Sequence, residues 1–565
     1  MNLLTKAKLI THILRWRIAW DKRDTRKAFT LPGNPKFMGP RDAVGLIRDG
    51  AVVGVSGLAG SQRASILYWA IRELFQETGH PSGLTLISIG GHGGRGKIPG
   101  TLEELGLEGL VTRFFTGHTE TYKSILRLAD RGVCEMQCIP QGTLALILGE
   151  MGEGRNYIIS DTGAGTFVDP RVGRGTPVVG DYPQYVEYVD GRFKYSCAHV
   201  DVAIFNAAAA DRKGNIYVKN AAMVAETRPL TQAAKRNQGK VIANVARIVE
   251  EGYDEIYVPA EDVDAVVLWK GTEQTAGTPY SRHFDFLTLN SKTPIKKGIE
   301  QIGLINRILG ITPRRKPVDD VLARLASSIF VENAKKGDYV DIGVGLPEEV
   351  SRLLFESGAM EDVTLMNESG VFGGLPTPGI FFGAAVNPEE IVSSTEAFQR
   401  IYKRLDAVIL GALQVDSQGN NNVSKRGDGA INYVGPGGFI DLTTCAELVL
   451  FCLSWGEGAD IQIENGAMRV LKNGVPKFVD QVDEITFCGA EALKHNKRVF
   501  YITHVGAFQL TPRGMELVRV MPGIDIQKDI IEACPMKVVL PEDGPVPVVS
   551  QVILTGEGYQ LKFPD

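Results

Sequence analysis

One acidic side chain directly follows a predicted buried strand. Glu368 comes after residues 363–366 (VTLM), in a turn that Asn367, Ser369 and Gly370 complete. In α/β proteins, ligands bind at the carboxyl ends of parallel strands. A carboxylate at that place, among apolar neighbours, would be partly desolvated and therefore reactive as a nucleophile. A solvated turn glutamate explains the same residues, so position alone leaves both interpretations open.

A glycine-rich segment, GGHGGRGKIPG (90–100), follows another predicted strand. It has the GxGxxG spacing of dinucleotide sites from Gly91 to Gly96, and as far as Ile98 it is close to a P-loop. Ile98 has no hydroxyl to bind Mg²⁺, and Pro99 interrupts the helix whose N-terminus would hold a phosphate. We therefore expect a flexible glycine loop beside an active site, not a nucleotide site.

Around these two segments, short β-branched runs alternate with longer helical patterns, which is typical of an α/β domain with a largely parallel sheet. The predicted strands are 51–57, 84–90, 241–248, 339–345, 363–366 and 407–413. The predicted helices are 64–78, 348–358 and 389–405. For the last helix, Asn387 is the expected N-cap, Pro388 the first helical residue, and Glu390 the partner in a capping box.

An internal repeat divides the chain. Residues 201–220 align without a gap on 406–425, with seven of twenty positions identical, and both copies predict a strand followed by a D-x-x-G-N turn. A second pair of similar segments is 84–94 and 363–374. We therefore expect two copies of one α/β unit. The predicted divisions are an arm (1–36), a first domain (37–270), a linker without sustained periodicity (271–319), a second domain (320–530) and a tail (531–565).

The first twenty residues contain no acid. Their basic residues are Lys6, Lys8, Arg15 and Arg17. Their apolar residues at helical spacing are Leu3, Leu4, Leu9, Ile10, Ile13, Leu14 and Ile18. A membrane-surface helix or a transit peptide would have this pattern, but an amphipathic arm packed on the body or on a second subunit is the expected structure.

Composition excludes several classes of protein. The chain has 565 residues with 61 basic and 66 acidic side chains, a net charge of −5, so no nucleic-acid partner is expected. Its seven cysteines include no CxxC, which is typical of reduced thiols in the cytoplasm, and its eight histidines form no metal-binding motif. The sequence contains no run of eighteen apolar residues, so it predicts no membrane span.

Several segments together resemble family I (class I) acyl-CoA transferases. NESGVFGG (367–374), followed by FFGAAVNPEEIV (381–392), resembles the segment that carries their nucleophilic glutamate. Further similar segments of the second half are 337–350, 416–424, 435–442 and 508–530, and those of the first half are 40–57, 139–142, 163–171 and 201–215. Their order is that of the fused two-domain form, and they are most similar to the short-chain acetate and acetoacetyl (3-oxoacid) transferases.

The resemblance implies two similar open α/β/α halves with the active site between them. It implies an enzyme (EC 2.8.3 type) that moves CoA from a short-chain acyl-CoA to an acceptor carboxylic acid through a thioester on Glu368. The acyl-CoA would be substrate, with no permanently bound cofactor, and the protein a homo-oligomer. Gly437 and Gly438 would donate backbone N–H groups to the oxyanion and contact substrate, with a plain tight turn as the alternative explanation. Asn422 would add a side-chain donor or stabilise its own turn.

The chain departs from the family pattern at two places. His92 stands where relatives often have glutamine, so His92 and Gly91 are expected to contact the substrate acid, and Arg63 replaces a proline-containing segment. Two other functions fit the same pattern. An acyl-CoA hydrolase needs only a wetter site, and a non-catalytic metabolite sensor with a duplicated sugar-phosphate-isomerase-like fold needs no nucleophile.

Overall fold

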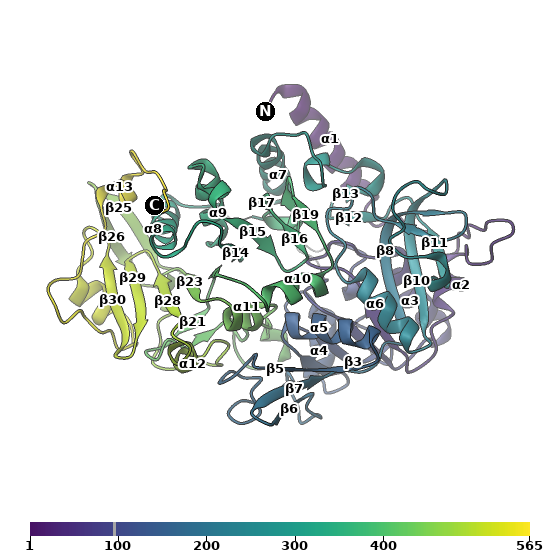
Figure 1. Ribbon diagram of the computed structural model, residues 1–565, viewed down its shortest axis with the longest axis horizontal. Coiled ribbons are helices and arrows are strands. Elements are labelled where there is room, and N and C mark those ends of the chain that lie inside the picture. The colour runs from purple at the N-terminus through teal and green to yellow at the C-terminus, as the bar shows by residue number, and fades with distance from the viewer. Residues whose placement is uncertain (94–97, 313, 565) are drawn as a thin grey trace.

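The computed structural model describes residues 1–93, 98–312 and 314–564, which form two α/β halves (Figure 1). Each half is built on a mostly parallel sheet, and they meet where helix α5 (Gln141–Gly152) of the first half packs on α10 (Ser394–Ile401) and α11 (Phe439–Cys445) of the second. This confirms the predicted fold class. Residues 94–97, with the Gly96 of the GxGxxG spacing, lie outside the described part of the chain.

The main sheet of the first half has the order β11-β10-β8-β1-β2-β3-β4, all parallel. These strands are β1 (Val52–Val55), β2 (Leu84–Ser88), β3 (Val111–Thr116), β4 (Glu135–Cys138), β8 (Val202–Asp211), β10 (Lys240–Val249) and β11 (Ala265–Leu268). The main helices of this half are α3 (Ser65–Thr78), α4 (Lys123–Asp130), α5 and α6 (Thr227–Arg236). A small antiparallel sheet of β5 (Tyr157–Ser160), β7 (Arg192–Ser196) and β6 (Val186–Val189) lies at the lower edge in Figure 1.

The sheet of the second half has the order β19-β16-β15-β14-β20-β23-β28-β29-β30, and its five central strands are parallel. Those five are β14 (Tyr339–Ile342), β15 (Thr364–Asn367), β20 (Ala407–Leu410), β23 (Leu448–Cys452) and β28 (Arg498–Ile502). Antiparallel strands extend both edges: β16 (Val371–Phe372), β19 (Glu390–Ile391), β29 (Gly506–Thr511) and β30 (Gly514–Val520). The longer helices are α8 (Pro317–Asn333), α9 (Glu348–Glu356), α10, α11 and α12 (Gly489–Lys494).

The repeat seen in the sequence is a repeat of strand order. The run β2-β1-β8-β10-β11 of the first half corresponds to β15-β14-β20-β23-β28 of the second. Both D-x-x-G-N turns form as predicted: Asp211 Oδ1 accepts backbone N–H groups after β8, and Asp416 Oδ1 does so after β20. The glycines have φ of +98° at Gly214 and +72° at Gly419, a conformation that favours glycine.

The helix predicted over 389–405 is shorter and begins later than expected. Residues 390–391 form strand β19, which pairs with β16, and α10 begins only at Ser394. The N-cap is Ser393, whose side chain accepts the backbone N–H of Glu396 at 3.1 Å, whereas Asn387 has a φ of +56°. The predicted cap was wrong because pairing in the sheet outweighs the local Pro-Glu-Glu signal for a helix start.

The segment 271–319, expected to lack regular structure, contains strands β12 (Glu273–Thr275) and β13 (Thr278–Pro279) and the fifteen-residue helix α7 (Ile295–Leu309). Helix α7 packs against the N-terminal helix α1 (Leu3–Ala19). The domain boundaries themselves stay predictions.

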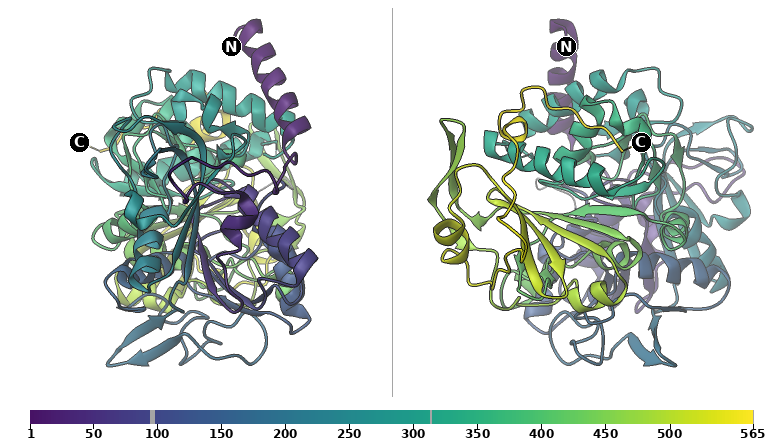
Figure 2. Two further views of the ribbon diagram at one scale, coloured as in Figure 1. Left: turned by 90° about the vertical axis from the view of Figure 1, so that its right-hand side faces the viewer. Right: turned by 60° about the vertical axis from the view of Figure 1, so that its left-hand side comes forward.

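The N-terminal arm packs on the body through one face only. In α1, Leu9, Ile13 and Trp16 are buried, and the helix projects from the molecule at its N-terminal end (Figure 2). A second apolar face is exposed, made of Leu3, Leu4, Ile10, Leu14 and Ile18. Packing on the body is thus confirmed for part of the helix. None of the helices in the described ranges is long and apolar enough to cross a membrane.

Candidate active site

The turn after β15 holds Glu368 in a fixed place. Ser369 donates its hydroxyl to the side chain of Asn367 and to the carbonyl of Gly383, and the N–H of Val371 donates to Asn367 Oδ1 at 3.3 Å. Gly370 has a φ of +95°, and a Cβ there would lie 2.1 Å from the carbonyl oxygen of Val392. The sequence NESG therefore places its glutamate at the carboxyl edge of the sheet.

The carboxylate of Glu368 receives hydrogen bonds from both halves. Gln141 Nε2, at the N-terminus of α5, donates to Oε2 at 2.9 Å, and the backbone N–H of Gly438 donates from the loop before α11. A Cβ at Gly438 would lie 2.2 Å from Oε1, so only glycine permits this approach. Two donors thus already face the oxygens at which a negative charge would develop during acyl transfer.

A cavity of about 340 Å³ opens onto this carboxylate. Its walls combine Gly91, His118 and Gln141 of the first half with Gly343, Glu368 and Gly438 of the second. Most of the other lining residues are glycine, leucine, valine or phenylalanine. The site therefore lies between the halves, in an enclosure large enough for a small acyl group.

Asp441 connects the halves behind Glu368. Its carboxylate accepts the backbone N–H groups of Gly142 and Thr143 at 2.8 Å each, and the hydroxyl of Tyr402 at 2.8 Å. It thereby caps the N-terminus of α5 from the second half and fixes the adjacent Gln141. Burial raises the pKa of Asp441 to about 6.

The environment also makes Glu368 a weaker acid than an ordinary glutamate. Burial, and next the nearby charge of Asp441, raise its pKa to about 7, while the hydrogen bonds from Gln141 and Gly438 oppose that shift. Asp341, buried on β14, has a pKa well above its ordinary value because of burial and the charge of Glu368. A carboxylate with few charge partners is a better nucleophile than a solvated one.

Three of the expected site residues need correction, beginning with Gly437. It lines the cavity, but its N–H donates to the carbonyl of Gly117 at 2.8 Å, so it has no free donor for an oxyanion. Asn422 is fully buried, its amide donates to Gln414 Oε1 and to the carbonyl of Lys425 at 2.8 Å each, and it does not line the cavity. Asn422 therefore stabilises its own turn, the alternative reading of the sequence.

His92 is the third correction. Its side chain is fully buried, with Nε2 3.0 Å from the hydroxyl of Tyr68, and burial lowers its pKa to about 3. Its backbone N–H donates to the hydroxyl of Tyr122 at 2.6 Å, which turns the ring into the core of the first half. The neighbouring Gly91 lines the cavity, as predicted. His118, and not His92, is the histidine in the cavity wall.

Sequence reasoning missed Gln141, His118 and Asp441. Gln141 belongs to the IPQG segment, and its place between a strand and a helix was a usable signal. Asp441 follows Gly438 by three residues, but nothing in the sequence indicates that it caps a helix of the other half. Arg63 does not line the cavity and pairs with Glu273.

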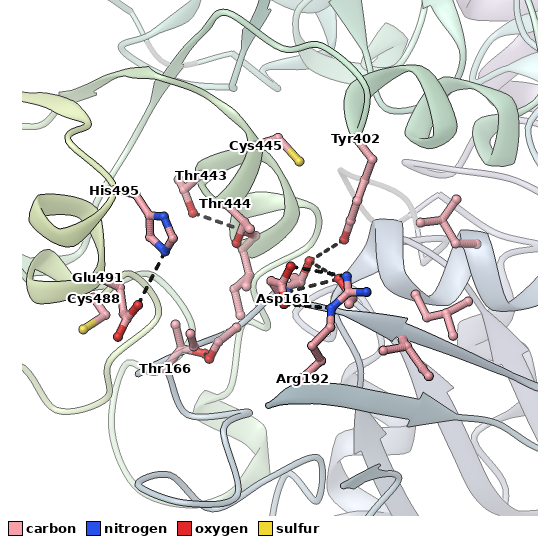
Figure 3. A pocket seen from close by; sticks show the side chains of 18 of the residues that line it. Asp161, Thr166, Arg192, Tyr402, Thr443, Thr444, Cys445, Cys488, Glu491 and His495 are labelled. Atoms are coloured by element: carbon pink, nitrogen blue, oxygen red, sulfur yellow. Dashed lines mark hydrogen bonds and ion pairs between the residues drawn. The ribbon is translucent and has the colours of Figure 1, made fainter. Parts of the chain in front are cut away.

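A larger cavity of about 870 Å³ lies between β5, β7 and α12 (Figure 3). Arg192 is paired with Asp161 at 2.9 Å, and His495 lies 3.7 Å from Glu491. Burial raises the pKa of the Cys445 thiol to about 12 and also raises that of Cys488, which disfavours the reactive thiolate form of both. Within the described ranges, no three His, Cys, Asp or Glu side chains are grouped to hold a metal ion. The smaller cavity is therefore the candidate active site.

Comparison with known proteins agrees with this geometry. The family model described as Coenzyme A transferase matches residues 37–268. Caffeate CoA-transferase of Acetobacterium woodii is 31% identical over 518 residues, which cover 88% of this chain and 93% of the relative. Acetate CoA-transferase YdiF of Escherichia coli K12 is 30% identical over 516 residues, covering 89% and 92%.

The chain belongs to the coenzyme A transferase family. The crystal structure of the YdiF apoenzyme from Escherichia coli O157:H7 superposes with a TM-score of 0.80 at 26% identity, covering 94% of this chain and 98% of that one. The same protein's thioester complex with CoA gives a TM-score of 0.78, covering 91% and 95%. The predicted family and enzyme class are confirmed: this CoA-transferase acts on acyl-CoA and carboxylic acids.

Proposed function

We propose that this CoA-transferase works by a ping-pong mechanism with Glu368 as covalent nucleophile. The observation that carries the proposal is the carboxylate of Glu368 in the cavity between the halves, with the N–H of Gly438 and the amide of Gln141 directed at it. The related YdiF enzyme has been crystallised as a thioester complex with CoA, which supports a thioester intermediate here.

In the first half-reaction, a Glu368 oxygen attacks the thioester carbonyl of the acyl-CoA. The C–S bond breaks, giving an acyl-glutamyl anhydride and CoA thiolate. The thiolate then attacks Cδ of Glu368 and expels the donor acid as its carboxylate, which leaves a glutamyl-CoA thioester. Gly438 N–H and Gln141 Nε2 stabilise the oxyanion that forms on Cδ, because they already donate to these oxygens in the resting enzyme.

The second half-reaction reverses these steps with the acceptor acid. The acceptor's carboxylate attacks the glutamyl thioester and CoA thiolate leaves, which gives a new anhydride. The thiolate then attacks the acyl carbonyl of that anhydride and releases the Glu368 carboxylate. The products are the new acyl-CoA and the free Glu368 carboxylate. No electrons are transferred, so the cycle needs no redox partner.

The small, largely aliphatic cavity favours short acyl groups. One relative is named for acetate, a short acid, and another for caffeate, a larger aromatic acid. We further infer that the enzyme keeps no permanently bound cofactor. Its scattered cysteines favour a cytoplasmic location. We also infer a homo-oligomer in which the exposed face of α1 contributes to assembly.

Trapping the intermediate tests the mechanism. Intact-mass measurement after addition of a panel of acyl-CoAs should show the mass of enzyme-bound CoA, and borohydride reduction followed by peptide mapping should place the modification on Glu368. A hydrolase would release CoA without an acceptor acid. Product CoA in the absence of acceptor, at the rate seen with acceptor, would therefore contradict the transferase mechanism.

A further inference from the structure

A third cavity, of about 410 Å³, lies between the N-terminal arm and the first half. Helix α1 forms one wall, and the start of α3 and the loops around β12 and β13 form the others. The arm is held there by His12 Nε2, which lies 2.6 Å from the carbonyl of Gly277, and by Trp16, whose indole N–H donates to Glu273. In Figure 1 the C-terminal end of α1 descends onto these strands.

The walls of this cavity are rich in tryptophan. Four of the five tryptophans in the chain line it: Trp16, Trp20, Trp69 and Trp269. They form two edge-to-face pairs, Trp16 with Trp20 at 5.5 Å and Trp69 with Trp269 at 5.7 Å between ring centroids. In each pair the two rings are nearly perpendicular, at 80° and 83°. Trp69 is buried and Arg17 covers one face of Trp20 at 4.1 Å, so the half-buried rings of Trp20 and Trp269 offer the apolar surface on which a planar ring can pack.

The charged groups of the cavity are almost all positive. Its one acidic lining residue, Glu273, is already neutralised, because it accepts from Trp16, from Arg63 and from the N–H of Gly277. Four further cationic residues line the cavity: Arg15, Lys22, Lys270 and Arg282. In the described part of the chain none of these four forms an ion pair. A cleft walled by one sign of charge concentrates ions of the opposite sign.

We propose that this cavity binds a nucleoside di- or triphosphate. Four unpaired cations match a polyphosphate better than a single carboxylate, the indole rings offer a stacking surface for a base, and the volume lies within the range of small-molecule sites. One wall comes from the arm, and no described residue lines both this cavity and the candidate active site, so the two cavities are distinct.

Tryptophan fluorescence of the full-length protein tests the proposal directly, with ADP and ATP as probes. Because most of the indoles line the cavity, both nucleotides should quench the emission saturably, and calorimetry should give the same affinity. Adenosine and inorganic pyrophosphate should each bind at least about ten times more weakly, since each lacks one of the two recognised groups. Equal affinity for pyrophosphate and ADP, or binding of CoA without binding of ADP, would contradict a nucleotide site.

Two double variants provide the matched comparison. Lys270→Ala with Arg282→Ala removes two exposed cations of the cavity and should weaken ADP binding at least about tenfold. Arg469→Ala with Lys472→Ala removes the same charge from an exposed hairpin of the second half and should leave binding unchanged. Equal weakening in both would show a general charge effect and overturn the proposal. The Glu368→Gln protein should bind ADP normally, so the test does not depend on the proposed mechanism.

Discussion

The carboxyl ends of β2 in the first half and β15 in the second are equivalent places in two sheets of the same strand order, yet they carry different side chains. After β2 the chain turns through glycines and buries His92 against Tyr68. After β15 it presents Glu368 to the cavity between the halves. The two copies share a strand order, but only the second carries a glutamate at this place, the residue that we propose as nucleophile.

The first half contributes differently, from a strand that has no counterpart in the second sheet. Gln141 follows β4, which extends the parallel sheet beyond β2, and the second half has the antiparallel β16 at that edge. The two halves therefore supply complementary parts of one site: the proposed nucleophile, Glu368, from one and an amide donor, Gln141, from the other. Substitutions in each half can break or sharpen this division.

The largest effect is expected at the nucleophile. Glu368→Gln should lower kcat by about 10⁴-fold or more, because the amide cannot form the thioester intermediate. Steady-state transfer assays and intact-mass spectra measure this loss. Substantial activity in that variant would overturn the covalent mechanism.

Stability provides the control for folding of this variant. The folded-state pKa of Glu368, about 7, lies above the ordinary value of 4.5, so its ionisation costs stability increasingly as pH rises between those values. Glu368→Gln escapes that cost. Its melting temperature should match the wild type near pH 4 and exceed it at pH 8.

Next in size is the effect at the glycine loop. Gly438→Ala should lower kcat by about 10²- to 10³-fold, since its Cβ would collide with Glu368 and displace the backbone donor. Gly437→Ala is the matched variant. Its φ of +58° makes alanine strained, but the nearest atom would be 3.6 Å away, so it should lower the melting temperature and leave kcat within a few-fold. If Gly437→Ala and Gly438→Ala lowered kcat equally, Gly437 would have to be reconsidered as an oxyanion donor.

A smaller effect should separate the two histidines near β2. His118 lines the cavity, so His118→Ala should change the ratio of kcat/KM between competing acids by about 10-fold or more. His92→Gln should leave that ratio unchanged, because its ring is buried away from the cavity. Competition assays with acetate and a larger acid decide between them. A shift in selectivity confined to His92→Gln would support the original sequence-based expectation.

The pH dependence should report on Asp441. In the proposed mechanism the reaction with acyl-CoA requires ionised Glu368, so kcat/KM should rise with pH through about 7. Asp441→Asn removes a nearby negative charge, which lowers the pKa of Glu368 and moves the midpoint to lower pH. Tyr402→Phe removes a hydrogen bond that lowers the pKa of Asp441, so Asp441 loses part of its charge near pH 7. The midpoint should therefore move in the same direction by a smaller amount, and an unchanged or raised midpoint in Asp441→Asn would exclude the charge explanation.

The smallest effect on chemistry is expected from the arm. Deletion of 1–36 should leave formation of the glutamyl-CoA intermediate intact, since the arm contributes no residue to the active cavity. Loss of the buried contacts of Leu9, Ile13 and Trp16 should lower the melting temperature, and light scattering should show a smaller assembly. An unchanged mass would remove the support for an assembly role of α1.

Local pattern in the sequence was enough for most of the central elements and singled out Glu368, whose role as nucleophile stays a prediction. Apolar β-branched runs predicted the central strands, and the repeat predicted two similar units, because these signals lie within a few consecutive residues. The helix start near residue 389 failed because β19 pairs with β16, a contact with another segment that no local signal records. The fifteen-residue helix α7 was missed within a segment rich in turn-forming residues.

The amino-acid sequence by itself determined the family and the fold, and it identified Glu368 as the candidate nucleophile, because short continuous segments carry each of these signals. Only the tertiary structure decided which neighbours complete the site. Gly437 and Gly438 are adjacent glycines, yet the N–H of Gly437 donates to the carbonyl of Gly117 and the N–H of Gly438 donates to Glu368. Gln141 and Asp441 reach the nucleophile's surroundings because α5 and α11 pack across the boundary between the halves. A hydrogen bond depends on where a donor points after packing, and that direction is set by contacts hundreds of residues apart in the chain.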